Sequence, residues 1–350
     1  MTKTYLVTGG AGFIGSNFVH YVLQEHGDVV VINVDKLTYA GNMDNLADLE
    51  GDSRHVFVRA DICNKSEIES LFAQYAIDYV VNFAAESHVD RSIADPSVFE
   101  RTNVKGTLAL LECANAAWRD RDGEFLPGKR FLQVSTDEVY GSLTLDEPDA
   151  FFREDSPIEP HSPYSASKAA ADLFALAFHA TYGLPVCVTR CSNNYGPYQF
   201  PEKLIPRMLT CAINHEPLPV YGDGLNVRDW LYVEDHCRAI ELVLAKGSNG
   251  EIYNIGGHNE LSNIVLVKKL LNAISEKTND NDVSEDLITY VEDRKGHDRR
   301  YAICPQKAVD ALGWRPETCF EDGIDKTIEW YLANTAWLKR IASGDYLLSR

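Results

Sequence analysis

Five residues in two short segments could carry out acid, base and hydride-transfer chemistry around one pocket. Thr136, Asp137 and Glu138 follow an apolar run, and Tyr164 and Lys168 stand four apart in a segment of helical character. On a helix, that spacing puts a phenol and an amine on one face. A hydroxyl, two carboxylates, a phenol and an ammonium group in one pocket suit an enzyme that oxidises, eliminates and reduces. We predict these five as catalytic residues.

The Tyr164 phenol would have to lose its proton to act as a base near neutral pH. Its usual pKa is about 10, and a neighbouring ammonium such as that of Lys168 would favour the phenolate. Tyr-x-x-x-Lys also occurs by chance on helix surfaces. The nearby hydroxyl of Thr136 and the glycine-rich loop described below favour a catalytic role for Tyr164 and Lys168 over such a chance pair.

The adjacent carboxylates of Asp137 and Glu138 would point to opposite faces if the preceding strand continued through them. To serve one pocket, they must lie on a turn or helix start beyond the strand. The alternative is a solvated acidic cap on that helix. The residues by themselves predict a carboxylate pair and do not assign acid and base to its members.

The elements that would position these residues alternate along the first half of the chain. Short, mostly apolar runs cover residues 5–7, 29–32, 56–58, 79–83 and 131–134. Such runs are expected of parallel strands covered on both faces. After the first run, apolar residues recur at helical spacing as far as Gly27, a plausible helix stop. The alternation predicts an α/β fold with a doubly wound parallel sheet of the Rossmann type.

A glycine-rich loop joins the first predicted strand to the first predicted helix. Gly9, Gly12 and Gly15 would allow a tight turn, the close approach of a pyrophosphate and the helix–strand contact. A plain tight turn is the alternative, because the spacing differs from the commoner Gly-x-Gly-x-x-Gly. Asp35 ends the second strand, where a carboxylate can bind the ribose hydroxyls of NAD. We therefore predict NAD as cofactor.

Two positions bear on the choice between NAD and NADP and on the adenine. The Asp35 charge would repel the 2′-phosphate of NADP, although Lys36 beside it could soften that repulsion. Asp61 and Ile62 follow the third strand and could meet the adenine. Asp61 could equally cap a helix.

The second half of the chain is less regular. After about residue 190, prolines interrupt the alternation, which predicts an NAD-binding domain over 1–190 and a smaller C-terminal substrate domain over 191–350. Parts of 228–258 could return to the first sheet. Segments 143–163 and 276–286 are rich in polar and turn residues and are predicted as loops, the first able to fold over a site.

Two predicted helices, 103–118 and 165–181, are apolar over more than one stripe. Helices of this kind are buried on two sides. One side must pack on the sheet, and the other could pack on a second subunit. The pattern predicts a homodimer built on these helices.

Composition excludes several classes of protein. A net charge of −19 argues against nucleic-acid partners and anionic membranes. The eight cysteines form no Cys-x-x-Cys pair, so buried free thiols are expected rather than a metal site. No signal peptide and no run near the roughly 20 apolar residues of a membrane span appear. We expect a cytoplasmic protein in which a few local cations bind an anionic small substrate.

The whole chain resembles the extended short-chain dehydrogenase/reductases, and within them the dTDP-glucose 4,6-dehydratases. The resemblance rests on Tyr164 with Lys168 and on residues 8–15 (TGGAGFIG), 35–42 (DKLTYAGN), 84–92 (AAESHVDRS), 136–141 (TDEVYG), 193–197 (NNYGP), 226–230 (NVRDW) and 293–298 (DRKGHD). It runs nearly end to end, without a departure at a motif position.

The resemblance implies a nucleotide-sugar lyase of deoxysugar (dTDP-rhamnose) biosynthesis. Tyr164 would take the proton of the glucose 4-hydroxyl while hydride leaves C4 for NAD. Glu138 would remove the hydrogen on C5, which the 4-ketone acidifies, and Asp137 would protonate the leaving 6-hydroxyl. Hydride would then return to C6, giving dTDP-4-dehydro-6-deoxy-glucose. The division of acid and base roles between the two carboxylates comes from the resemblance.

The resemblance also implies the binding residues. Facing NAD would be Gly9, Gly12, Phe13, Ile14, Gly15, Asp35, Lys36, Leu37, Thr38, Asp61, Ile62, Ala84, Ala85, Thr102, Tyr164, Lys168 and Asn194. Facing the nucleotide-sugar would be Ser87, His88, Thr136, Asn193, Lys203, Leu204, Pro219, Tyr221, Arg228, Asn263, Arg294 and His297. For any single cation among these, a surface ion pair with the abundant acids is the competing interpretation.

Three alternatives stay open at this point. A nucleotide-sugar 4-epimerase shares the glycine loop and the Tyr/Lys pair, but it has no elimination step and no need for Asp137 and Glu138. A dehydratase for another nucleotide-sugar, such as UDP-glucose, would need only small changes in the second domain. An NAD-responsive binding protein that has lost catalysis is the non-enzyme alternative, and the intact set of five catalytic residues argues against it.

Overall fold

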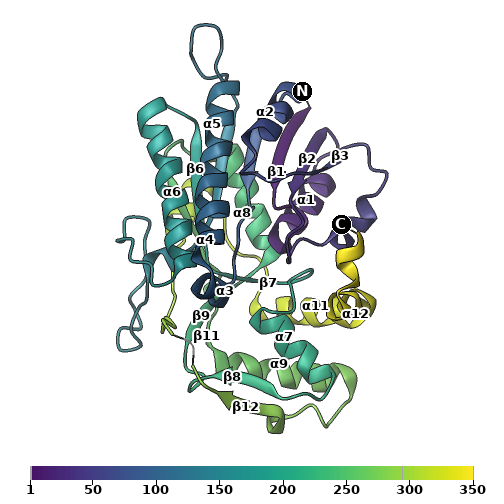
Figure 1. Ribbon diagram of the computed structural model, residues 1–350. Coiled ribbons are helices and arrows are strands. Elements are labelled where there is room, and N and C mark those ends of the chain that lie inside the picture. The colour runs from purple at the N-terminus through teal and green to yellow at the C-terminus, as the bar shows by residue number, and fades with distance from the viewer. Residues whose placement is uncertain (1, 294, 350) are drawn as a thin grey trace.

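The computed structural model describes residues 2–293 and 295–349, and its centre is a seven-stranded parallel sheet (Figure 1). The strands are β1 (Lys3–Thr8), β2 (Val29–Asp35), β3 (His55–Arg59), β4 (Tyr79–Asn82), β5 (Arg130–Thr136), β6 (Val186–Cys191) and β10 (Ile252–Ile255). Their order is β10-β6-β5-β4-β1-β2-β3. The doubly wound α/β prediction is confirmed, and the five predicted runs correspond to β1 to β5, with Phe83 one residue beyond the end of β4.

The chain builds the sheet outward in two directions from β1. It adds β2 and β3 on one side and then crosses to β4, β5 and β6 on the other. The order therefore reverses between β1 and β4. Open α/β sheets bind ligands beyond the carboxyl ends of their strands at such a reversal. The loops after β1 and β4 are thus placed to form a site.

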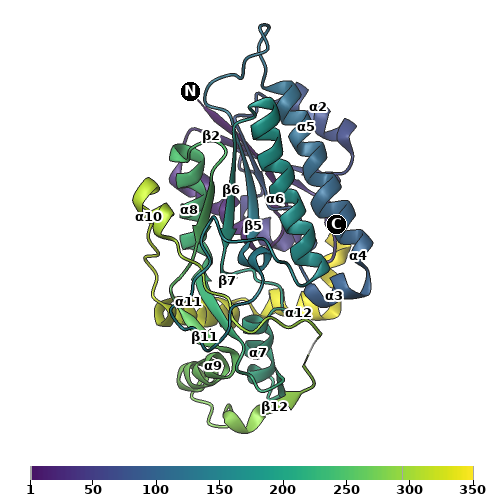
Figure 2. The same ribbon diagram turned by 90° about the vertical axis from the view of Figure 1, so that its left-hand side faces the viewer.

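Helices cover both faces of the sheet, as Figure 2 shows for α5 and α6 on one face and α8 on the other. The helices on the large sheet are α1 (Phe13–Glu25), α2 (Lys65–Gln74), α5 (Thr107–Ala117), α6 (Pro163–Tyr182) and α8 (Val233–Lys246). Neighbouring strand residues enter opposite cores: Val7 packs with α1 and α8, whereas Leu6 packs with α2, α5 and α6. Burial on both faces explains why the strands are continuously apolar.

A second group of elements lies below the large sheet in Figure 1 and has a core of its own. Its sheets are β7 (Asn193–Tyr195), β9 (Val227–Tyr232) and β11 (Glu260–Ser262), and separately β8 (Leu218–Tyr221) with β12 (Ile288–Val291). Its helices are α7 (Leu204–Ile213), α9 (Asn263–Thr278), α11 (Phe320–Ala333) and α12 (Thr335–Ser343). The remaining helices are α3 (Val89–Ala94), α4 (Pro96–Phe99) and α10 (Gln306–Leu312), with the short turns η1 (Met43–Leu49), η2 (Glu100–Gly106), η3 (Asp137–Tyr140), η4 (Glu285–Leu287) and η5 (Asp345–Ser349).

Several boundaries differ from those expected from the sequence. The first helix ends at Glu25, because His26 is already extended, and not at Gly27. The helix expected over 103–118 begins as a π-helical stretch, η2, and is regular only in α5. Segment 276–286 is not a plain loop, since α9 continues to Thr278 and η4 starts at Glu285. Segment 143–163 does lack a helix or strand until α6 begins at Pro163.

Two general properties complete the fold. Among the described residues, no helix is long and apolar enough to cross a membrane. All eight cysteines are free thiols; four are buried, and Cys319 is exposed.

Candidate active site

The glycine loop after β1 is shaped by close backbone contacts. Gly9 has a φ of +71°, and a Cβ there would lie 2.7 Å from the Ala84 nitrogen in the loop after β4. A Cβ on Gly15 would lie 2.2 Å from the Gly9 carbonyl oxygen. The cradle thus closes only without side chains at these positions. Because the first N–H groups of α1 point out of its N-terminus, the cradle fits a pyrophosphate.

Asp35 joins the end of β2 to this loop. One carboxylate oxygen accepts a hydrogen bond from the Ala11 N–H at 3.0 Å, and the other accepts one from Leu37 at 2.7 Å. The carboxylate is therefore fixed beside the position of a ribose. Lys36 forms an ion pair with Asp61 at 2.8 Å. Partial burial acts to raise the pKa of Asp61, but the hydrogen bonds from Lys36 and from the Cys63 N–H lower it overall.

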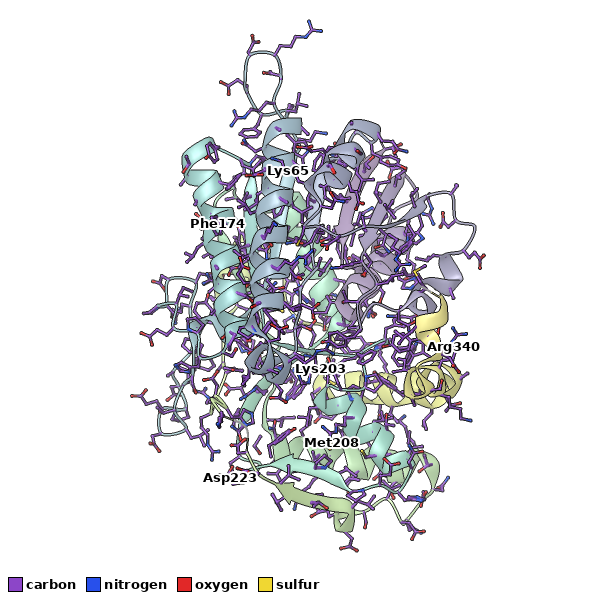
Figure 3. The ribbon with its side chains drawn as sticks, viewed as in Figure 1. Lys65, Phe174, Lys203, Met208, Asp223 and Arg340 are labelled. Carbon is purple, nitrogen blue, oxygen red and sulfur yellow. The ribbon has the colours of Figure 1, made fainter. Side chains whose placement is uncertain are left out.

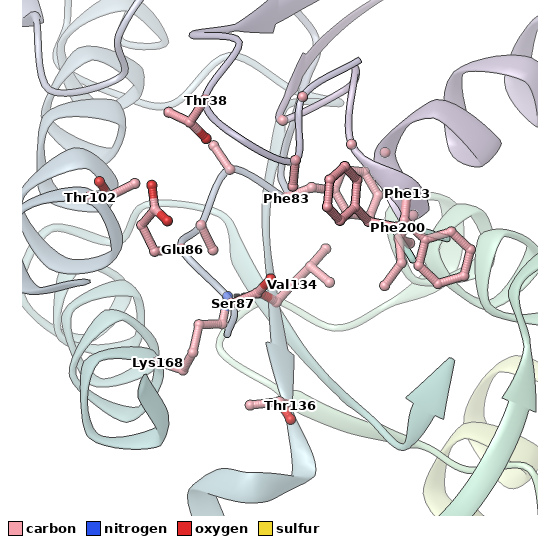
Figure 4. A pocket seen from close by; sticks show the side chains of 18 of the residues that line it. Phe13, Thr38, Phe83, Glu86, Ser87, Thr102, Val134, Thr136, Lys168 and Phe200 are labelled. Carbon is pink, nitrogen blue, oxygen red and sulfur yellow. Dashed lines mark hydrogen bonds between the residues drawn. The ribbon is translucent and has the colours of Figure 1, made fainter. Parts of the chain in front are cut away.

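A cavity of about 300 Å³ extends from the glycine loop to the end of β5 (Figure 4). In Figure 4, Thr38 and Thr102 lie on one side of it, Phe13 and Phe200 on the other, and Thr136 stands at the end of its strand. The predicted residues that line it are Gly9, Gly12, Phe13, Ile14, Gly15, Asp35, Lys36, Thr38, Asp61, Ile62, Ala84, Ala85, Ser87, Thr102, Thr136, Asp137, Glu138, Tyr164, Lys168, Asn193, Asn194 and Lys203.

The two adjacent carboxylates reach the same cavity because the strand stops just before them. β5 ends at Thr136, and the 3₁₀ turn η3 starts at Asp137. The Thr136 hydroxyl accepts a hydrogen bond from the Glu138 N–H at 3.3 Å and thereby caps the turn. It also donates to the Asp137 carboxylate at 3.2 Å. Side chains alternate between the two faces of a strand, but this strand ends before the carboxylates and so does not separate them.

Asp137 is the more enclosed of the two carboxylates. Its side chain is buried, and its Oδ2 has no hydrogen-bond partner among the described residues. Burial, followed by the charges of Glu138 and Asp229, raises its pKa well above the ordinary value of 3.8. Glu138 is only half-buried. A carboxyl group in the surroundings of Asp137 holds a proton that it can donate.

Tyr164 and Lys168 extend from the first turns of α6, and both are buried. The Lys168 ammonium donates a hydrogen bond to the Val134 carbonyl at 2.6 Å. Burial lowers the pKa of Lys168, and the charge of Asp172 opposes that effect. Burial and the charge of Glu138 raise the pKa of Tyr164 well above 10. The protein by itself therefore keeps Tyr164 as a phenol, so the effect of Lys168 expected from the sequence does not dominate.

Some predicted binding residues do not line this cavity: Leu37 and His88 adjoin lining residues in the chain, and most of the others lie on α7, β8, β9 and α9. Among the described residues predicted to bind, those that do not line it are Leu37, His88, Leu204, Pro219, Tyr221, Arg228, Asn263 and His297. The buried Arg228 donates to the carbonyls of Val227 and Asp298 and stacks on Tyr301. The Tyr221 and His297 rings lie 6.4 Å apart. Arg294 lies outside the described residues.

Several cavity residues were not predicted from the sequence, among them Glu86, Cys191, Gln199, Phe200 and Glu202. Glu86 is buried, and burial raises the pKa of its carboxyl. It lies within the 84–92 motif, yet the spacing of that motif did not indicate a role for a carboxylate. Cys191 is the last residue of β6, and Gln199, Phe200 and Glu202 lie in the irregular segment after β7, where sequence periodicity gives no position.

Comparison with known proteins agrees with this geometry. Residues 6–327 match the family model described as GDP-mannose 4,6 dehydratase. The dTDP-glucose 4,6-dehydratase of Xanthomonas campestris pv. campestris (strain B100) is 53% identical, over 99% of this chain and 98% of its own.

Solved structures separate two reactions that share the fold. DesIV, a dTDP-glucose 4,6-dehydratase from Streptomyces venezuelae determined with NAD and TYD bound, has a TM-score of 0.87 and 48% identity, covering 97% of this chain and 99% of its own. A UDP-glucose 4-epimerase from Thermotoga maritima has a TM-score of 0.83 but only 30% identity, covering 95% and 99%. By both sequence identity and TM-score, this chain is thus more similar to the dehydratase than to the epimerase.

Proposed function

This chain belongs to the GDP-mannose 4,6 dehydratase family, and we propose that it catalyses the NAD-dependent 4,6-dehydration of dTDP-glucose. The observation that carries the proposal is the Asp137–Glu138 pair in one cavity with Tyr164 and Lys168. An oxidation alone would need only the second pair. A buried, protonated carboxyl beside a second, more open carboxylate is what removal of water also requires.

The cradle around Gly9 and Gly15 and the carboxylate of Asp35 fit NAD. NAD held there would supply a hydride acceptor for C4 of the sugar and, once reduced, a hydride donor for C6. The Lys36–Asp61 ion pair occupies the ammonium that would otherwise be free for a 2′-phosphate, which favours NAD over NADP.

The first proton transfer falls to Tyr164. It can accept the proton of the sugar 4-hydroxyl only as a phenolate, and positive charge close by is needed to favour that form because burial and Glu138 hold its pKa high. The buried Lys168 supplies part of that charge, and a cationic nicotinamide would supply the rest. Thr136 is placed to hydrogen-bond the same hydroxyl.

Elimination of water falls to the two carboxylates. The half-buried Glu138 takes the proton from C5, and the protonated Asp137 donates its proton to the departing 6-hydroxyl. This assignment agrees with the family-based expectation and adds a physical reason for it. The group that must hold a proton is the one with the raised pKa.

The substrate would run from the cavity toward the second group of elements. Lys203 lies between the large sheet and that group in Figure 3, and its ammonium donates to the Ser87 carbonyl at 2.8 Å. We assign Lys203, Asn193 and Ser87 to the sugar diphosphate side of the substrate. Leu204, Pro219, Tyr221, Arg228, Asn263 and His297, with Arg294, are proposed for the nucleotide beyond it.

The proposed division into two domains has structural support of its own. Segment 233–255 contributes α8 and β10 to the large sheet. The remaining elements after residue 190 mostly share the separate core of α7, α9 and α11. We therefore propose an NAD-binding part made of 1–190 with this returning segment, and a nucleotide-sugar part made of the rest of 191–350.

A homodimer through α5 and α6 is also a proposal. The helix α6 is strongly apolar, and two of its apolar side chains, Leu173 and Phe174, are 55% and 40% exposed. Exposed apolar side chains that lie together indicate an association surface. A monomeric mass in dilute solution would refute the dimer. We further propose a cytoplasmic location, which the eight free thiols support.

The function is tested by incubating the protein with dTDP-glucose and, separately, with UDP-glucose. We expect a 4-keto-6-deoxy product, detected by its absorbance in alkali, from dTDP-glucose. Epimerised sugar without the keto product would contradict the proposal. In the variant Glu138→Gln, exchange of the C5 hydrogen with solvent deuterium should stop while C4 oxidation persists. Unchanged turnover in that variant would remove Glu138 from the assigned role.

A further inference from the structure

The 337–346 segment lies against the NAD-binding loops although nearly the whole chain separates them in sequence. Figure 1 shows α12, coloured yellow, beside the purple elements that begin the chain, and Figure 3 labels Arg340 there. Within the part of the chain that the structure describes, no residue of 337–346 lines the cavity. These residues reach it through the loop between β2 and β3 and through Phe200, which follows β7 and lines the cavity.

Trp337 is connected to the glycine loop by two hydrogen bonds in series. Its indole N–H donates to the Asn45 side-chain oxygen at 2.8 Å, and the Asn45 amide donates to the Ala11 carbonyl at 3.0 Å. Trp337 and Asn45 are 7% and 1% exposed. Ala11 in turn donates its N–H to Asp35. Through Asn45, α12 therefore fixes the position of Ala11 in the glycine loop.

Tyr346 makes a second connection. Its hydroxyl donates to the Tyr39 carbonyl at 2.7 Å. Its ring lies 6.0 Å from that of Phe200, which itself lies 5.9 Å from the Tyr39 ring and lines the cavity. An ion pair between Arg340 and Asp44, at 2.8 Å, adds a third. The 337–346 segment thus contacts both the β2–β3 loop and the segment after β6, on two sides of one cavity.

We propose that Trp337 and Tyr346 are positioning residues that hold these two sides together and so keep the dinucleotide bound throughout the reaction. The proposal rests on the NAD-dependent cycle described above. Hydride taken from C4 must return to C6 of the same sugar. Loss of the reduced dinucleotide between these events would leave an oxidised sugar that the enzyme cannot reduce. A structure that slows dissociation therefore serves the chemistry directly.

The variants are Trp337→Phe, which removes the indole donor together with part of the ring, and Tyr346→Phe, which removes only the hydroxyl. Ile341→Ala is the control, because Ile341 packs against the second core from the same helix. Each full-length protein is loaded with NADH, and the dissociation rate is measured by trapping in the absence of sugar, with Tm recorded alongside. We expect dissociation about five to ten times faster in each Phe variant. Ile341→Ala should lower Tm without a comparable change in that rate.

Two outcomes would overturn the proposal: parental dissociation rates in both Phe variants, or rates that simply follow Tm across all three variants. Asn45→Ala combined with Trp337→Phe provides a second check. If the two residues act through one connection, the double variant should release NADH no faster than the more affected single variant. Fully additive effects would contradict the relay. Since no sugar is present, these results stand whether or not the chain dehydrates dTDP-glucose.

Discussion

At the scale of single residues, we propose that Asp137 turns a dehydrogenase site into a dehydratase site. A carboxyl group keeps its proton where burial outweighs the effect of nearby cations, and at Asp137 burial outweighs the charge of Arg228. The sequence could predict the carboxylate pair and its need for a turn. It could not predict that Asp137 is the buried member, or that Asp229 and Arg228 on β9 act on its pKa, because these contacts join distant segments.

Asp137→Asn should reduce formation of the 4-keto-6-deoxy product by about 10²–10⁴-fold, since the leaving hydroxyl loses its proton donor. Oxidation at C4 does not need this group and should persist. The near-ultraviolet absorbance of reduced nicotinamide should therefore rise on mixing with dTDP-glucose and decay slowly. Turnover at the parental rate would show that another group donates the proton.

The same substitution should make the protein more stable at neutral pH. The folded pKa of Asp137 is raised above 3.8, so its contribution to stability is fully present below that pH and is lost as pH rises toward the folded value. Asn cannot ionise and avoids this loss. We expect Tm of the variant to exceed that of the parent by a few degrees near pH 7, with the gap closing toward pH 4. A gap independent of pH would contradict the assignment.

At the scale of elements, the positions of the site residues depend more on the loops than on the strands that these loops follow. The five N-terminal strands were predictable because a doubly covered sheet requires continuous apolar runs. The π-helical stretch η2, which follows α4 and contains Thr102 and Asn103, could not be predicted from the sequence. Asn103 bonds both backbone groups of Glu86 and also Ser167 on α6, contacts between segments that no local pattern reveals.

Gly15→Ala should abolish stable NAD binding, because its Cβ would lie 2.2 Å from the Gly9 carbonyl oxygen and would push the loop out of shape. Gly27→Ala is the matched control, since a Cβ there meets no atom within 4 Å. Bound NAD after gel filtration should fall at least about tenfold in the first variant and stay unchanged in the second. Equal retention by both would mean that the loop has another conformation.

Arg300 should anchor the irregular segment 143–163. It forms a two-point ion pair with Glu260 and donates to the carbonyls of Glu147, Pro148 and Ala150. Arg300→Met should lower stability by about 2–3 kcal/mol and expose the segment to limited proteolysis. Arg299→Met is the control, because its pair with Asp223 is more exposed and worth about 0–1 kcal/mol. Cleavage elsewhere would exclude the anchoring role.

At the scale of the whole molecule, the proposed dimer surface can be tested by charge. Phe174→Asp should shift the sedimentation coefficient toward that of a monomer, because a charge would enter the apolar surface on α6 (Figure 3). Tyr290→Asp is the control: Tyr290 is 58% exposed, but it lies on β12 in the second group of elements. A parental sedimentation coefficient in Phe174→Asp would exclude this surface.

The sequence was least informative about contacts between distant segments. Local spacing was enough to predict the glycine loop and to select five candidate catalytic residues that the structure brings into one cavity. The hydrogen bonds of Trp337 with Asn45 and of Tyr346 with Tyr39 join segments with no shared periodicity, and the Arg340–Asp44 ion pair between them is one of many charge pairings that the sequence allows. For the same reason, sequence spacing did not place Phe200 and Glu202 in the cavity.

The order of the sheet also bears on how the chain folds during synthesis. β10 and α8 come from residues 233–255, yet they complete an edge and a face of the N-terminal sheet. Until they leave the ribosome, Leu132 and Val134 on that face lack their α8 neighbours. Exposed apolar surface in incomplete intermediates favours aggregation and chaperone binding. The nascent chain should therefore acquire its native protease resistance only after residue 255 has emerged.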